Sequence, residues 1–130
     1  MDFPKIDCHV HLFDPARFPY PPDNFYQPTG HEIATAAQLG HTLDAHGVRH
    51  ALLVGPNSGY GLDNRCMLDA IAHSAGRYKG VAVVPLNASL GELQDLQAAG
   101  VVGVALNVAL LCVDYYRAAG PLLERLRQLD

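Results

Sequence analysis

The stretch IDCHVHLFDP at residues 6–15 decides the fold class, because it opens with an apolar run that is typical of a β-strand. Successive side chains on a strand point to opposite faces, so we expect Asp7, His9 and His11 to share one face. Two neutral imidazoles about 6–7 Å apart along a strand can share a metal ion, or orient one water or one carbonyl. A chance pair on a structural strand is the alternative, because His-x-His alone is a weak signal.

Three further apolar runs, at residues 51–54, 80–84 and 101–107, are nearly continuous in Val, Ile, Leu and Ala. Continuous runs are typical of parallel strands that are covered on both faces. Helix signals lie between the runs, and the resulting order is βαβαβαβα. The sequence therefore predicts an α/β fold, the N-terminal half of a (β/α)8 TIM barrel with four βα units.

The helix signals are of three kinds, and each has a physical basis. Capping boxes satisfy the first N–H groups of a helix, glycines end helices, and a leucine stripe packs one face on a sheet. The capping boxes are Thr35 with Gln38 and Ser89 with Glu92; the glycines are Gly47, Gly76 and Gly100; the stripes are Leu68, Ile71, Ala72 and Ala75, and Leu122, Leu126 and Leu129 after Pro121.

Composition limits the classes of partner. The 130 residues fit one domain, residues 1–130, and a net charge of −4 offers no basic surface for nucleic acid. Because no run approaches roughly 18 apolar residues and the start has no apolar leader, we expect no membrane contact and a cytoplasmic location. Three widely spaced cysteines without Cys-x-x-Cys predict no disulfide framework.

Several motifs resemble those of one known family in their order along the chain and in their residues. They are IDCHVH at residues 6–11, SGYGLDN at 58–64, GVAVV at 80–84 and GVVGVALNV at 100–108. Together they resemble the front half of the amidohydrolase superfamily, in the branch of 2-pyrone-4,6-dicarboxylate lactonase and its uncharacterised relatives. The resemblance implies a barrel of metal-dependent-hydrolase type whose site is completed by His and Asp residues from the second half.

The present chain holds four of the eight expected βα units. We expect a truncated part of a longer protein, inactive without the C-terminal half. Two alternatives stay open: two copies pair as a homodimer that closes a barrel, or the four strands form an open, non-catalytic sheet that serves as an assembly module. Unpaired strand edges invite pairing.

Substrate contacts are expected after the strands, since active sites of βα barrels lie at the C-terminal ends of the strands. Glycines in the loop at residues 55–64 permit tight turns that bring Ser58 and Tyr60 near the histidine pair. Asn107 follows the fourth strand as a further polar contact. By resemblance, Tyr26 and Ser58 match residues that hold substrate. Asp63 and Asn64 are predicted N-caps of the next helix.

Two positions depart from the family pattern. Related sequences place arginines that grip substrate carboxylates at Ala105 and near Leu111, and both are apolar here. A carboxylate left unpaired in such a pocket costs several kcal/mol of desolvation. The resemblance therefore implies a small-molecule substrate other than the pyrone dicarboxylate, with a lactone, ester or cyclic amide carbonyl.

We predict a hydrolase of aromatic compound catabolism with His9 and His11 as catalytic residues. The pair either binds one divalent cation, with zinc favoured, or polarises the carbonyl without metal, as the resembled lactonase does. Asp7 is expected to orient a histidine or to satisfy backbone groups. A metal-dependent decarboxylase of the same superfamily is the rival enzyme.

Overall fold

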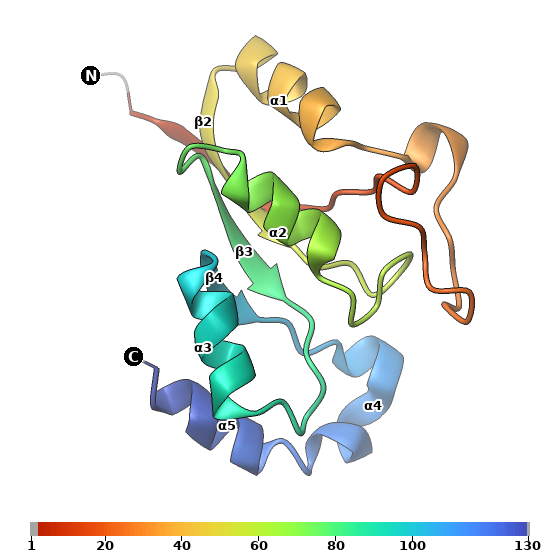
Figure 1. Ribbon diagram of the computed structural model, residues 1–130, viewed down its shortest axis with the longest axis vertical. Helices are drawn as coiled ribbons and strands as arrows, with labels where there is room; N and C mark the ends of the chain where they lie inside the picture. The colour runs from red at the N-terminus through yellow and green to blue at the C-terminus, as the bar shows by residue number, and fades with distance from the viewer. Residues whose placement is uncertain (1–2, 130) are drawn as a thin grey trace.

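The computed structural model describes residues 3–129 and contains one sheet of four parallel strands (Figure 1). The strands run in the order β1-β2-β3-β4, so each lies beside its neighbour in the chain. Their bounds are Lys5–Val10 for β1, Val48–Val54 for β2, Tyr78–Ala82 for β3 and Val101–Val104 for β4. The predicted parallel βα alternation is confirmed; residues 1, 2 and 130, which the predicted domain includes, lie outside the described residues.

Helices α1, α2 and α3 follow one another along the sheet and pack on β2, β3 and β4 in turn (Figure 1). They span Ala36–Ala45, Arg65–Ala72 and Leu90–Ala98, and α5 at Gly120–Arg127 packs against α3. Both predicted capping boxes are present, with the Thr35 and Ser89 hydroxyls accepting from the N–H groups of Gln38 and Glu92. The helix ends are therefore local features that the sequence predicts correctly.

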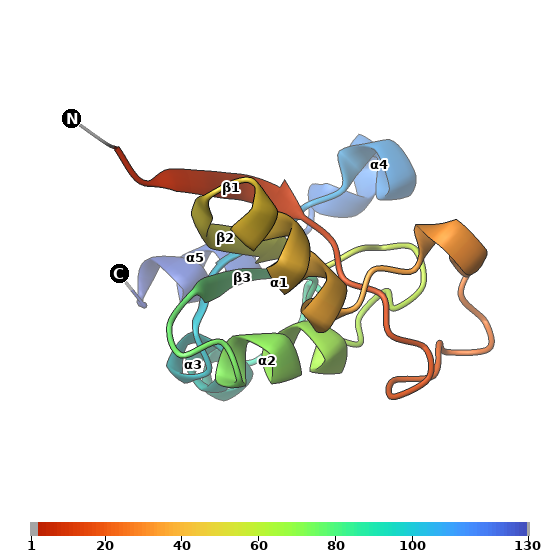
Figure 2. The same cartoon turned by 90° about the horizontal axis from the view of Figure 1, so that it is seen from above.

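Helix α4, Val108–Tyr116, was not predicted, and the expected strand at 101–107 ends at Val104. Asn107 starts this helix, because its Oδ1 accepts a hydrogen bond from the N–H of Leu110 at 3.1 Å. A second unpredicted element is the short 3₁₀ helix η1, Gly30–Glu32. Figures 1 and 2 place α4 beyond the carboxyl ends of the strands, at the same end as the long loops.

The core lies between the sheet and its helix layer. Leu53 and Ala82 are buried on the sheet side, Met67 and Ile71 on α2, and Val10 of β1 packs against the same cluster. Burying one such Leu or Ile side chain contributes about 1.5–3 kcal/mol. No helix among residues 3–129 is long and apolar enough to cross a membrane.

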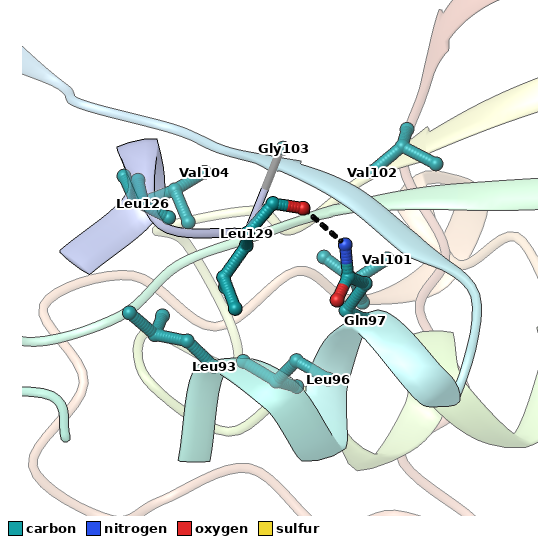
Figure 3. A pocket seen from close by; sticks show the side chains of 9 residues that line it. All are labelled: Leu93, Leu96, Gln97, Val101, Val102, Gly103, Val104, Leu126 and Leu129. Atoms are coloured by element: carbon teal, nitrogen blue, oxygen red, sulfur yellow. Dashed lines mark hydrogen bonds between the residues drawn. The ribbon is translucent and has the colours of Figure 1, made fainter. Parts of the chain in front are cut away.

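The two outer strands carry apolar side chains that this core does not cover. Ile6 on β1 is 57% exposed, and Val102 on β4 is 63% exposed. An apolar gap also lies between α3, β4 and α5, lined by four leucines and three valines together with Gln97 and Gly103 (Figure 3). Its one amide is occupied, since Gln97 Nε2 donates to the Leu129 carbonyl at 2.8 Å. This gap is a feature of helix packing without reactive groups.

Candidate active site

The two histidines of the opening motif lie together at the carboxyl end of β1. Their ring centroids are 5.0 Å apart in an edge-to-face arrangement, and both side chains are exposed. Val10, between them in sequence, packs against the core on the other face. Asp7 accepts a hydrogen bond from the backbone N–H of His9 at 3.1 Å, so it serves the backbone of the strand.

His11 is anchored to the neighbouring strand by its ring. Its Nδ1 lies 2.8 Å from the carbonyl oxygen of Val54 at the end of β2. A carbonyl oxygen only accepts, so Nδ1 carries the proton and Nε2 of the neutral ring keeps its lone pair. This is the arrangement that metal-binding histidines adopt, with the second ring nitrogen donating to a carbonyl. A neutral His11 is therefore suited to bind a cation or accept a proton, and it can donate from Nε2 only as the imidazolium.

A hollow of about 570 Å³ opens beside the pair, within the size range of small-ligand sites. Of the predicted substrate contacts, Ser58 and Asn107 line it together with His9 and His11. Asn107 has a second role that the sequence did not indicate, since its Oδ1 caps α4. The remaining lining residues are Phe25, Val54, Gly55, Pro56, Asn57, Ala105, Leu106, Val108 and Ala109.

Tyr26 lies outside this hollow. Its hydroxyl donates to Oε1 of Glu32 at 2.5 Å, and Glu32 also accepts from the N–H of Thr29. The hydrogen bond raises the pKa of Tyr26 and lowers the pKa of Glu32. Tyr26 is thus engaged in holding the loop around η1 in the described part of the chain, and the structure does not bring it to the histidines.

Tyr60 is a core residue and is only 2% exposed. Its hydroxyl accepts from the N–H of Asp14 at 3.0 Å and donates to the carbonyl of Phe18 at 2.9 Å. Its ring stacks on Phe13 with centroids 6.2 Å apart, and burial raises the pKa of the phenol. The structure thus assigns Tyr60 to joining the loop after β2 to the loop after β1, rather than to an open contact.

We expect Tyr60→Phe to lower the free energy of unfolding by about 1–3 kcal/mol, because the variant leaves the half-buried N–H of Asp14 and carbonyl of Phe18 without their partner. Urea unfolding of the full-length protein measures the change. Tyr115→Phe is the matched control, since the Tyr115 hydroxyl makes no hydrogen bond within residues 3–129. Equal stability of the two variants would contradict the joining role.

Asn64 stands at the N-cap position of α2, as predicted, but its side chain makes no capping hydrogen bond there. Its amide instead pairs with the backbone of Val83, donating from Nδ2 to the carbonyl at 2.9 Å and accepting at Oδ1 from the N–H at 3.1 Å. Asp63 accepts from the N–H of Arg65, and the Arg65 guanidinium lowers the pKa of this carboxyl. Asn64 therefore holds the loop after β2 against the end of β3, a long-range contact without a local sequence signal.

Two ligands are fewer than a metal site requires. Among residues 3–129 no group of three or more His, Cys, Asp or Glu side chains is placed to hold a cation. The donor set of His9 and His11 suits zinc, whose catalytic sites commonly have three protein ligands. The pair therefore fits part of such a site.

Comparison with known proteins decides the family, because the amidohydrolase family model matches residues 6–130. The chain belongs to the amidohydrolase family. It is 39% identical over 85% of its length to a 2-pyrone-4,6-dicarboxylate hydrolase of Comamonas testosteroni, covering 35% of that protein. It is 33% identical over 75% of its length to a 4-sulfomuconolactone hydrolase of Rhizobium radiobacter, covering 32% of it.

Solved structures agree with this assignment. A probable 2-pyrone-4,6-dicarboxylic acid hydrolase of Acinetobacter baumannii, crystallised with citric acid, matches 98% of the chain with a TM-score of 0.85 and 32% identity. The chain covers 47% of that structure, and about a third of the curated relatives above. The predicted fold, four βα units that correspond to the N-terminal half of an amidohydrolase barrel, is confirmed.

Ala105 and Leu111, the two positions where the resemblance implies a departure from the family pattern, each line a hollow of the structure. Ala105 lines the hollow beside the histidines, and Leu111 lines an adjoining hollow under α4. Phe25 and Asn57 line both hollows, so the two spaces adjoin. Both residues lie in loops after strands, where the sequence predicts substrate contacts.

Proposed function

We propose that the chain carries the first half of the active site of a hydrolase that cleaves a lactone or ester carbonyl in a small organic molecule. One observation carries the proposal: His9 and His11 lie edge to face beside an open hollow, and the Val54 carbonyl fixes the tautomer of His11. The names of the relatives, a pyrone dicarboxylate hydrolase and a sulfomuconolactone hydrolase, support a lactone as the substrate.

The reaction consumes one water for each lactone. The water oxygen bonds to the carbonyl carbon, the bond from that carbon to the ring oxygen breaks, and the ring oxygen leaves with a proton as a hydroxyl. The lone pair on Nε2 suits His11 for accepting the water proton or for binding a cation. Ser58 and Asn107 are the proposed polar contacts to the substrate, and Tyr26 and Tyr60 hold the surrounding loops.

His9 and His11 are the residues that would hold a divalent cation, with zinc favoured by two imidazole ligands. Such an ion supplies Lewis-acid polarisation of the carbonyl and lowers the pKa of water. In the alternative without metal, a neutral imidazole donates a hydrogen bond to the developing oxyanion. Because Nδ1 of His11 already donates to Val54, this alternative assigns the donor role more readily to His9.

The proposed substrate differs from the pyrone dicarboxylate. Ala105 lines the histidine hollow, and the thirteen lining residues include no Lys or Arg. A substrate carboxylate that faced Ala105 would have no cation from this half of the barrel, which costs several kcal/mol. A lactone without a carboxylate at that position fits better.

The test uses the purified full-length protein with uncharged γ-lactones, aryl esters and 2-pyrone-4,6-dicarboxylate, while carbon dioxide release is followed in parallel. We expect ring opening of an uncharged lactone, much slower turnover of the dicarboxylate and no carbon dioxide. Treatment with a chelator followed by zinc separates the two mechanisms, since only the metal-dependent one loses and regains activity. Carbon dioxide release without lactone opening would instead establish the decarboxylase. Absence of both hydrolysis and carbon dioxide release would favour a non-catalytic module.

A further inference from the structure

The hollow under α4 adjoins the histidine hollow and has a different character. Leu110, Leu111 and Tyr115 of α4 line it together with Phe25 from the loop after β1. All four side chains are exposed, with Phe25 66% exposed. Large apolar side chains that surround an open space favour an apolar ligand there.

Charge in this second hollow excludes an anion. Within the described residues its lining holds no Lys, Arg or His, and its only charged members are Asp23 and Asp63. The Asp63 carboxylate is already paired with the Arg65 guanidinium at 2.7 Å. A ligand carboxylate would therefore face the acidic Asp23 and uncharged side chains, among them the amides of Asn24 and Asn57, without a compensating cation.

The backbone of α4 is strained where it forms this wall. Cys112 has φ 61° and ψ 166°, a conformation that is almost confined to glycine. The strained turn is fixed from both sides: Asn107 caps Leu110 through Oδ1, and the N–H of Asn107 donates to the Tyr116 hydroxyl at 2.9 Å. Strained backbone persists where the surrounding contacts determine it, and it is concentrated at ligand sites. Asn107 thus connects the histidine hollow with the position of Leu110 and Leu111.

We infer that Leu110, Leu111, Tyr115 and Phe25 form a subsite for an uncharged apolar group, aryl or branched alkyl, attached to the lactone or ester that His9 and His11 engage. The inference rests on the proposed hydrolase function and adds the chemical class of the substituent. Continuity of the two hollows through Phe25 and Asn57 places the substituent beside the reacting carbonyl.

The test compares γ-phenyl-γ-butyrolactone with γ-butyrolactone-γ-carboxylate on the full-length protein, because the two share the ring and differ in the substituent. We expect the wild type to prefer the phenyl lactone by at least about tenfold in kcat/KM, since an unpaired carboxylate is costly. Leu111→Arg should lower that preference by about tenfold or more, because a guanidinium pairs with the carboxylate. Leu110→Gln is a second variant that weakens the subsite without adding charge.

Leu123→Arg is the matched control, because Leu123 is exposed on α5 and lines neither hollow. Equal kcat/KM for the two lactones, or no difference between Leu111→Arg and Leu123→Arg, overturns the subsite and leaves the hydrolase proposal standing. If neither these lactones nor the aryl esters are hydrolysed, the hydrolase proposal fails, and calorimetric binding decides the subsite. The subsite is then supported if the wild type binds the phenyl lactone and if Leu111→Arg and Leu110→Gln weaken this binding. Absence of binding overturns the subsite.

Discussion

His11→Ala should lower kcat/KM for lactone opening by about 10²–10⁴-fold, the usual contribution of a positioned acid or base. The expected loss has a specific cause. Nδ1 of His11 donates to the Val54 carbonyl, so Nε2 holds the lone pair at the hollow, and alanine removes it. Because the ring is exposed, we expect the free energy of unfolding to fall by only about 0.5–1.5 kcal/mol, one net hydrogen bond.

His73→Ala is the control for this prediction. Its Nδ1 also lies 2.8 Å from a backbone carbonyl, that of Asp69, and its exposed ring follows the last residue of α2. His73→Ala therefore removes the same kind of hydrogen bond, at a position outside the candidate site. Steady-state kinetics and urea unfolding of both variants separate chemistry from stability, and wild-type turnover in His11→Ala would remove the site assignment.

Asn64→Ala should lower the free energy of unfolding by about 2–4 kcal/mol. The variant leaves the N–H and the carbonyl of Val83 without partners, and each unpaired buried backbone group costs about 1–3 kcal/mol. Val83 is buried, so water replaces the lost amide poorly. Chemical denaturation of the full-length protein measures the change, with the slope checked for two-state behaviour.

Asn87→Ala provides the comparison for Asn64→Ala. Asn87 lies in the loop after β3, whereas Asn64 lies in the loop after β2; Asn87 is exposed, and its side chain makes no hydrogen bond within residues 3–129. Surface substitutions of this kind usually change stability by less than about 0.5 kcal/mol. A loss at Asn64 no greater than the loss at Asn87 would show that the contact with Val83 contributes little.

Local patterns explain why most of the fold could be predicted from the sequence. Thr35 with Gln38 and Ser89 with Glu92 form their capping boxes within four residues, and the opening apolar run forms a strand, Lys5–Val10, as predicted. Helix α4 escaped prediction because VALLCVDYY continues the apolar run of β4 without a helical stripe. Its start depends on one side-chain cap, and its interior contains a left-handed residue, which no pattern indicates.

The candidate site was predictable in part for the same reason. His9 and His11 share a face because strand alternation is a local rule, and Ser58 and Asn107 follow strands. Tyr26 was assigned by resemblance and Tyr60 from the turns of its loop, whereas their hydroxyls bind Glu32 and the backbone of the first loop. The partner of Tyr60 lies 42 residues away in the chain and depends on tertiary packing, which spacing along the chain does not encode.

The bond from His11 to Val54 ties reactivity to the alignment of two strands. If β1 slipped by one residue against β2, the imidazole would lose its carbonyl and the alternation of faces would reverse. Selection for the proposed hydrolase activity would therefore also preserve the pairing of the first two strands. A substitution that shifts this pairing would disturb the proposed site and the sheet together.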